Sequence, residues 1–243
     1  MAMNPVEIVL LYQSLLGIYG DRGNAVVLRE RLRARGREAV LRQIEPGQPV
    51  PASGAIYLLG GGEDAAQVTA VRQLRQDGRL FAALDAGACL FAVCAGFQIT
   101  GRSFTVGHDD QVIEGLGLLD VETRRGPRRA VGEVLSRWTK PDGGQSVITG
   151  FENHGGHTYL GPEATPLARV EVGVGNNGDG TEGAVQGRII GCYPHGPVLA
   201  RNPELADHLL ELALGQPLDP LPNPEIDDLR RQRLDWARRH HRR

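Results

Sequence analysis

Short segments rich in apolar residues alternate with amphipathic segments in the first hundred residues of the chain. Uninterrupted apolar runs of this length are typical of strands that are covered on both faces. The four predicted strands are Val6–Tyr12, Glu38–Ile44, Ala55–Leu59 and Cys89–Val93. Apolar residues recur at helical spacing between them, which predicts helices over Ala25–Arg35, Asp64–Gln76 and Leu80–Ala86. This alternation predicts an α/β fold, with a doubly wound, mostly parallel sheet and flanking helices.

The pattern changes after about residue 103, where the segments become short, β-rich and separated by glycine-containing turns. We expect these segments to continue the same sheet with antiparallel and edge strands. Two further helices are predicted over Leu205–Leu214 and Glu225–Arg239. No repeat or low-complexity linker divides the chain. We therefore predict one domain over residues 1–216, followed by a charged C-terminal helical tail over 217–243.

The composition of the chain excludes several classes of function and of site. The formal net charge of −2 gives no reason to expect a nucleic acid partner. The apolar run near the N-terminus is too short to cross a bilayer, and no basic leader precedes it, so we expect a cytoplasmic protein without membrane insertion. Its three cysteines form no CxxC pair and show no zinc-ligand spacing. We therefore predict a reduced protein without a metal site.

Cys94 lies where the predicted strand Cys89–Val93 gives way to a helix, and the small residues Ala95 and Gly96 follow it. A nucleophile on so sharp a turn needs small neighbours, because the backbone there is strained. The beginning of the following helix favours the thiolate over the thiol. The alternative is a buried structural cysteine, which is our interpretation of the other two cysteines.

His195 follows the predicted strand Arg188–Tyr193 in the segment CYPHGP. The carboxyl ends of parallel strands meet at one edge of a doubly wound sheet, so we expect His195 close to Cys94. A cysteine hydrolase needs such a base, far along the chain and near in the fold. A solvated loop histidine is the alternative.

Six segments between about Val6 and Leu214 have a recognisable character, namely GIYGDRGN, LLGGGEDAAQ, FAVCAGFQITG, TGFENHGGHT, GVGNNGDGTEG and CYPHGPVLARNPELAD. Together they resemble the class I glutamine amidotransferases of the cobyric acid synthase type. Within this family the resemblance is strongest to the glutaminase subunits of lipid II isoglutaminyl synthases.

The resemblance implies that Cys94 attacks the side-chain amide of L-glutamine and that His195 moves the protons. It also implies an oxyanion hole formed by the backbone amides of Ala95 and of Gly61 and Gly62. Ala95 stands where related sequences often have glycine. Taken alone, the three glycines of LLGGGE also suit a phosphate cradle or a tight turn.

Arg129 matches by its spacing the arginine with which the resembling subunits bind glutamine, although the adjacent Arg128 is an alternative. A guanidinium suits the α-carboxylate of the substrate. A solvated basic loop would explain the same residues. Gln98, one turn into the predicted helix after Cys94, is expected to line the pocket.

The third catalytic residue is left open by the sequence. Many class I amidotransferases carry glutamate two residues after the histidine, where this chain has Pro197. Asp21 and Glu152 are the two candidates to orient His195. Helix N-capping is the alternative role for Asp21.

The resemblance also implies a partner. The chain has no G-x-x-x-x-G-K-[ST] loop, so ATP and Mg²⁺ are expected on a separate Mur-ligase-like synthase subunit, with no cofactor on this chain. The pair would amidate the D-glutamate of lipid II to D-isoglutamine. The alternatives are a glutaminase of a cobyric acid synthase-like pathway and a non-catalytic binding module. The basic tail is either a solvated helix or a docking element for the partner.

Overall fold

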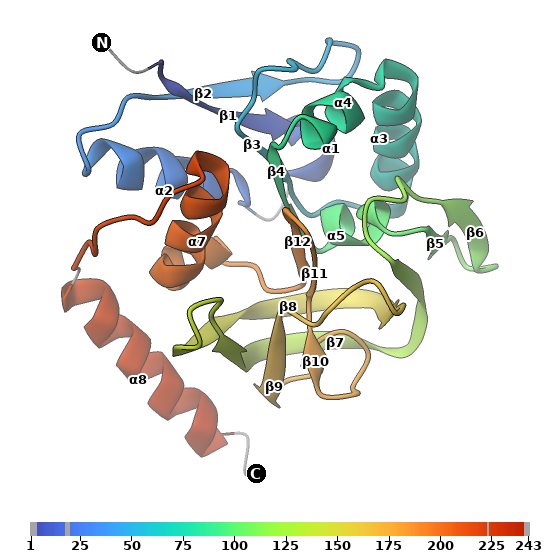
Figure 1. Ribbon diagram of the computed structural model, residues 1–243. Coiled ribbons are helices and arrows are strands. Elements are labelled where there is room, and N and C mark those ends of the chain that lie inside the picture. Colours follow the sequence, from blue (N-terminus) through green and yellow to red (C-terminus); the bar gives the residue numbers. More distant parts are fainter. Residues whose placement is uncertain (1–3, 18–19, 223, 241–243) are drawn as a thin grey trace.

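A parallel sheet forms the centre of the molecule in the computed structural model, which describes residues 4–17, 20–222 and 224–240 (Figure 1). Its strand order is β11-β12-β4-β3-β1-β2, and only β11 runs antiparallel to its neighbour. The strands are β1 (Val6–Leu11), β2 (Ala39–Ile44), β3 (Ile56–Leu59), β4 (Cys89–Val93), β11 (Ala184–Gln186) and β12 (Ile189–Cys192). All residues of β3 and β4 are buried, as their unbroken apolar sequences predict.

Helices cover both faces of this sheet, so the predicted doubly wound α/β fold is confirmed. Figure 1 shows α2 and α7 on one side of it and α1, α3, α4 and α5 on the other. The helices are α1 (Gln13–Leu16), α2 (Arg22–Arg33), α3 (Asp64–Asp77), α4 (Arg79–Asp85), α5 (Ala95–Thr100), α6 (Val198–Arg201), α7 (Pro203–Leu214) and α8 (Pro224–His240). The predicted bounds of the early elements differ from these by up to three residues, as expected where helix ends fray.

The prediction that the second half continues the same sheet is wrong for most of it. Only β11 and β12 join the first sheet, and the other strands form a second one. Its order is β10-β9-β7-β5-β6, with β8 paired to β7. The strands are β5 (Ser103–Val106), β6 (Gln111–Glu114), β7 (Val121–Thr139), β8 (Gln145–Leu160), β9 (Ala168–Val172) and β10 (Thr181–Glu182).

The long hairpin β7–β8 dominates the second sheet and explains the error. Its polar and glycine positions look like turns in the sequence, but they lie within paired strands whose faces are partly exposed. The pairing shifts register between Arg125 and Ala130, so the basic segment between them bulges out of the ladder.

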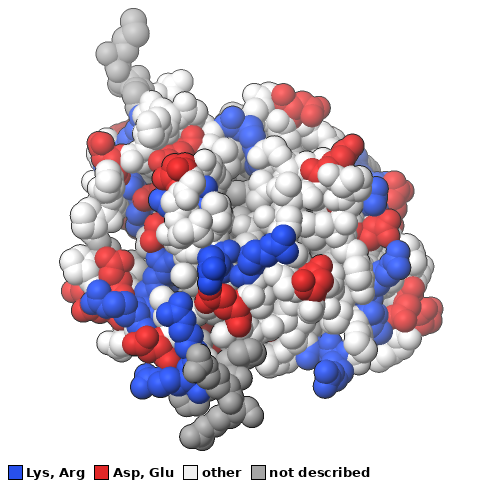
Figure 2. All heavy atoms as spheres, turned by 60° about the horizontal axis from the view of Figure 1, so that its bottom comes forward, with Lys and Arg blue, Asp and Glu red and all other residues white. Residues whose placement is uncertain are grey.

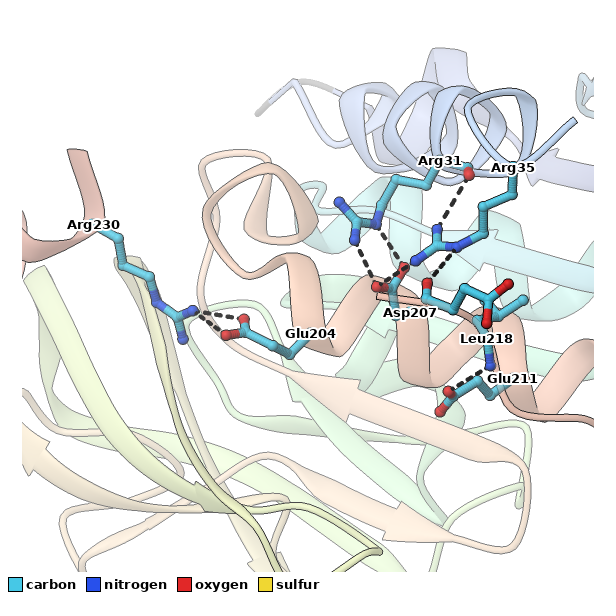
Figure 3. Close-up of polar contacts among 8 residues, drawn as sticks. Arg31, Arg35, Glu204, Asp207, Glu211, Leu218 and Arg230 are labelled. Carbon is cyan, nitrogen blue, oxygen red and sulfur yellow. Dashed lines mark hydrogen bonds and ion pairs between the residues drawn. The ribbon is translucent and has the colours of Figure 1, made fainter. Parts of the chain in front are cut away.

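The C-terminal region packs onto the domain through ion pairs. Asp207 of α7 accepts hydrogen bonds from Arg31 and Arg35 of the α2 region (Figure 3). Arg230 of α8 pairs with Glu204 of α7, and Ala237 packs against the second sheet. The predicted tail is therefore a helix held against β7, although residues 223 and 241–243 lie outside the described part.

Basic side chains lie among acidic ones on the face of the molecule shown in Figure 2. Arg231, Arg233 and Arg238 each keep more than half of the side-chain surface exposed. Within the described ranges, no helix is both long and apolar enough to cross a membrane.

Candidate active site

Cys94 occupies a strained turn between β4 and α5. Its φ of 52° and ψ of −109° are unusual for a residue with a side chain. The turn is anchored by the Cys94 N–H, which donates to the Cys192 carbonyl at 2.8 Å. The close packing requires glycine at position 96, where a Cβ atom would lie 2.7 Å from the Leu59 carbonyl oxygen. The tight approach thus holds the thiol at the carboxyl end of β4, as the strand–Cys–small–Gly pattern predicts.

His195 reaches Cys94 from the end of β12. Its backbone is paired in both directions with Phe151 of β8, at 2.9 and 3.1 Å. Nδ1 of its ring lies 3.3 Å from Oδ1 of Asp21. Burial lowers the pKa of the imidazole, but the interactions with Asp21 and Cys94 outweigh this effect and raise the pKa to about 10. The surroundings of His195 therefore favour its protonated form.

Asp21 connects His195 to the glycine loop after β3. Its Oδ2 accepts the Gly61 N–H at 2.8 Å, and the side chain is 2% exposed. It makes no capping hydrogen bond to α2, so the N-cap alternative is not what the structure shows. Because Asp21 engages the Gly61 N–H, that amide does not point to a substrate oxyanion in this structure, contrary to the expectation for Gly61.

The carboxylate of Glu152 is bonded to the loop after β9, whereas Asp21 bonds to the His195 ring, which favours Asp21 as the third catalytic residue. The Glu152 carboxylate accepts the N–H groups of Val174 and Gly175 at 2.7 and 2.9 Å. The Nε2 atom of His154 lies 3.5 Å from it. Glu152 therefore orders the loop after β9 and the neighbouring histidine.

A cavity of about 390 Å³ opens beside Cys94. Gln98, Gly62 and Arg129 line it, as the sequence led us to expect, whereas Ala95 and Gly61 do not. The residues that line it are Gly62, Glu63, Asp64, Ala65, Gln67, Cys94, Gln98, Thr105, Gly107, His108, Arg125, Arg129, Asn153, His154, Gly155 and Gly156.

Only one of the two adjacent arginines reaches the cavity beside Cys94. Arg129 lines this cavity and donates through Nε to Oδ1 of Asn153 at 2.7 Å. A second hollow is lined by both arginines, but Arg128 does not line the cavity beside Cys94. The structure therefore favours Arg129 over Arg128 as a ligand for a molecule in the cavity.

A chain of polar side chains begins at Gln67 and Gln98 in the cavity wall and continues behind it, and only Gln98 was expected from the sequence. Gln98 accepts a hydrogen bond from Gln67 at 2.6 Å and donates to the Tyr193 hydroxyl at 3.3 Å. That hydroxyl also pairs with Thr158 at 2.6 Å, and the His154 ring stacks on Tyr193 with centroids 3.6 Å apart. These residues come from four distant elements, so no local pattern could bring them together.

Comparison with known proteins gives a consistent family. The profile of the CobB/CobQ-like glutamine amidotransferase domain matches residues 7–203. The subunit GatD of the glutamine-hydrolyzing lipid II isoglutaminyl synthase of Staphylococcus aureus (strain N315) is 32% identical over 229 residues, covering 93% of this chain and 91% of that protein. The same subunit of Streptococcus pneumoniae (strain ATCC BAA-255 / R6) is 30% identical, with coverages of 86% and 80%. The cobyric acid synthase of Sphingopyxis alaskensis is 34% identical over 178 residues, which are 70% of this chain but 34% of that protein.

Solved structures agree on the fold. A crystal structure of a glutamine amidotransferase superposes with a TM-score of 0.56 at 23% identity, covering 84% of this chain and 98% of the other. The structure of PurLQS from Thermotoga maritima superposes with a TM-score of 0.60 at 16% identity, with coverages of 88% and 99%. At these identities the likeness establishes architecture alone.

Proposed function

The chain belongs to the CobB/CobQ-like glutamine amidotransferase family, and we propose that it is a glutaminase subunit in which Cys94 is the nucleophile. The observation that carries this proposal is the meeting of Cys94, His195 and Asp21 at the carboxyl ends of β4, β12 and β1, beside a cavity. A thiol, a base and a residue that orients the base are the parts that acyl transfer requires.

In the proposed reaction the Cys94 thiolate attacks the side-chain carbonyl carbon of L-glutamine. The C–N bond then breaks, and the His195 imidazolium gives its proton to the leaving nitrogen, so that ammonia departs and a thioester remains. Water attacks the thioester while His195 accepts its proton, which releases glutamate and regenerates the thiolate. Asp21 keeps the imidazole in place and stabilises its protonated form.

Two backbone amides are proposed to stabilise the oxyanion of each tetrahedral intermediate. The Ala95 N–H directly follows the nucleophile, as is usual for such turns. The second is Gly62, which lines the cavity, because the Gly61 N–H is held by Asp21. Loss of one such donor typically costs about a hundredfold or more in rate.

The substrate would be held by its charged end. Arg129 offers a guanidinium at the cavity, steadied by Asn153, and a fork of this kind pairs well with an α-carboxylate. We therefore propose that Arg129 binds the carboxylate of glutamine.

We also propose that the ammonia is passed to a Mur-ligase-like, ATP- and Mg²⁺-using subunit that amidates the D-glutamate of lipid II in the cytoplasm. Two relatives named as subunits of the lipid II isoglutaminyl synthase match this chain over 91% and 80% of their length. These two matches extend over 93% and 86% of this chain, whereas the match to the cobyric acid synthase of Sphingopyxis alaskensis extends over 70% of it. The longer match favours the lipid II pathway over the cobyric acid alternative.

The test compares Cys94→Ala with Cys89→Ala in the complex purified from cells. The first variant should abolish glutamine-dependent glutamate release, whereas the second, a buried cysteine within β4, should retain it. Unchanged hydrolysis by Cys94→Ala would support the non-catalytic binding module instead. Co-purification of a Mur-ligase-like chain, identified by mass spectrometry, would support the lipid II assignment, and a corrin-pathway synthetase in its place would overturn it.

A further inference from the structure

Glu182 is an acidic side chain with no contact to solvent beneath the proposed catalytic residues. It lies on β10 and is 0% exposed. Its Oε1 accepts the backbone N–H of Tyr193 at 2.8 Å. Its Oε2 is buried and has no hydrogen-bond partner within the described part of the chain. A fully buried carboxyl group calls for an explanation, because burying its charged form without hydrogen bonds or a counter-charge costs free energy.

The peptide that Glu182 holds leads directly to His195. Tyr193 is the residue after β12, and His195 follows it by two positions. The turn is then fixed at three points: at the Tyr193 N–H by Glu182, at the His195 backbone by Phe151, and at the His195 ring by Asp21. Movement at the first point would displace the imidazole from Cys94.

We infer that Glu182 is a positioning residue for His195 that acts as an uncharged acid. This inference rests on the proposed glutaminase function and adds to it a residue outside the cavity. Glu182 touches neither the substrate cavity nor the thiol, so it acts only through the Tyr193–His195 turn.

The uncharged form follows from the surroundings of Glu182. The pKa of Glu182 is raised to about 8, mainly by burial and also by the Glu152 carboxylate, while the Tyr193 N–H opposes the rise. The other titratable groups near it are the Cys192 thiol and the Tyr193 hydroxyl. The Cys192 thiol is also affected by Asp21 and Cys94, so Glu182 belongs to one cluster with these groups. A carboxylate at this point would add a negative charge close to the Glu152 carboxylate, without a second hydrogen bond to stabilise it.

The experiment compares Glu182→Gln and Glu182→Ala with wild type and with Glu163→Gln, an exposed control. Glutamine hydrolysis by the complex and alkylation of Cys94 by iodoacetamide are measured from pH 6 to 10. Glu182→Gln keeps an oxygen for the Tyr193 N–H, so its kcat at pH 7 should stay within about twofold of wild type. Glu182→Ala should lose kcat by about tenfold to a hundredfold, because the imidazole is displaced.

The pH profiles separate positioning from simple packing. Wild type and Glu163→Gln should lose activity above pH about 8 as Glu182 ionises. Glu182→Gln should keep its activity until His195 loses its proton near its pKa of about 10. Identical profiles for Glu182→Gln and wild type would overturn the inference, even if Glu182→Ala fails to fold. If wild type hydrolyses no glutamine, the proposed function fails, while the alkylation profiles still test the role of Glu182.

Discussion

The carboxylate of Asp21 bridges His195 and the glycine loop: Oδ1 lies 3.3 Å from the imidazole Nδ1 and Oδ2 accepts the Gly61 N–H at 2.8 Å. One buried side chain therefore connects the proposed base to the segment from which an oxyanion donor is proposed. Its position in the fold, after β1 at the edge where β3, β4 and β12 also end, is the crevice in which doubly wound sheets bind their ligands.

Replacing Asp21 by Asn should lower kcat for glutamine hydrolysis by about a hundredfold or more, because the amide can neither stabilise the imidazolium nor hold its tautomer. Steady-state glutamate release by the complex measures this. Glu152→Gln is the informative comparison, since Glu152 contacts His154 and the 174–175 backbone instead. Normal activity of Asp21→Asn together with loss in Glu152→Gln would reverse the assignment.

The raised pKa of His195 predicts a pH-dependent stability. The folded pKa of about 10 exceeds the ordinary value of 6.5, so folded protein binds the proton more tightly than unfolded protein. The resulting stabilisation is complete below pH 6.5 and is lost as pH rises through about 10. The urea midpoint of wild type relative to His195→Gln should therefore fall between these pH values. A difference that grows with pH would contradict the imidazolium, and His108→Gln, at an exposed position, is the control.

Arg129→Ala should raise KM for glutamine by about tenfold to a hundredfold with a smaller effect on kcat, since a charge-assisted hydrogen bond contributes about 1.5–3 kcal/mol. The matched control is Arg128→Ala, because this neighbour does not line the cavity beside Cys94. Initial rates across glutamine concentrations distinguish the two parameters. Equal KM increases in both variants would indicate a general effect of basic charge.

Arg230→Ala should destabilise the protein by about 0.5–1.5 kcal/mol, because it removes the hydrogen bonds of Arg230 to partly exposed acceptors. The side chain of Arg230 is 11% exposed and binds Glu204, the Ser146 hydroxyl and the Val147 carbonyl. Arg231→Ala, whose side chain is 72% exposed and pairs with Asp228 one turn away, should change stability by about 0.5 kcal/mol or less. Urea unfolding of both variants provides the measurement. Equal effects would show that α8 is not held by Arg230.

The strand pairing of the second half of the chain could not be predicted from the sequence. The long strands β7 and β8 pair mainly with each other, and their exposed faces give no continuous apolar signal. The polar partners of the site are equally non-local. Glu182 bonds to a residue eleven positions away, and Asp21 to one 174 positions away.

The sequence by itself determined the parallel core and the places of Cys94 and His195, because buried strands leave a local apolar pattern and the ends of parallel strands meet by topology. Only the tertiary structure decided that Asp21 bonds to the His195 ring, and that Arg129, not Arg128, lines the cavity beside Cys94. It also decided that the Gly61 N–H donates a hydrogen bond to Asp21. These choices depend on which side chains long-range packing brings within hydrogen-bonding distance, and the local sequence pattern does not show this.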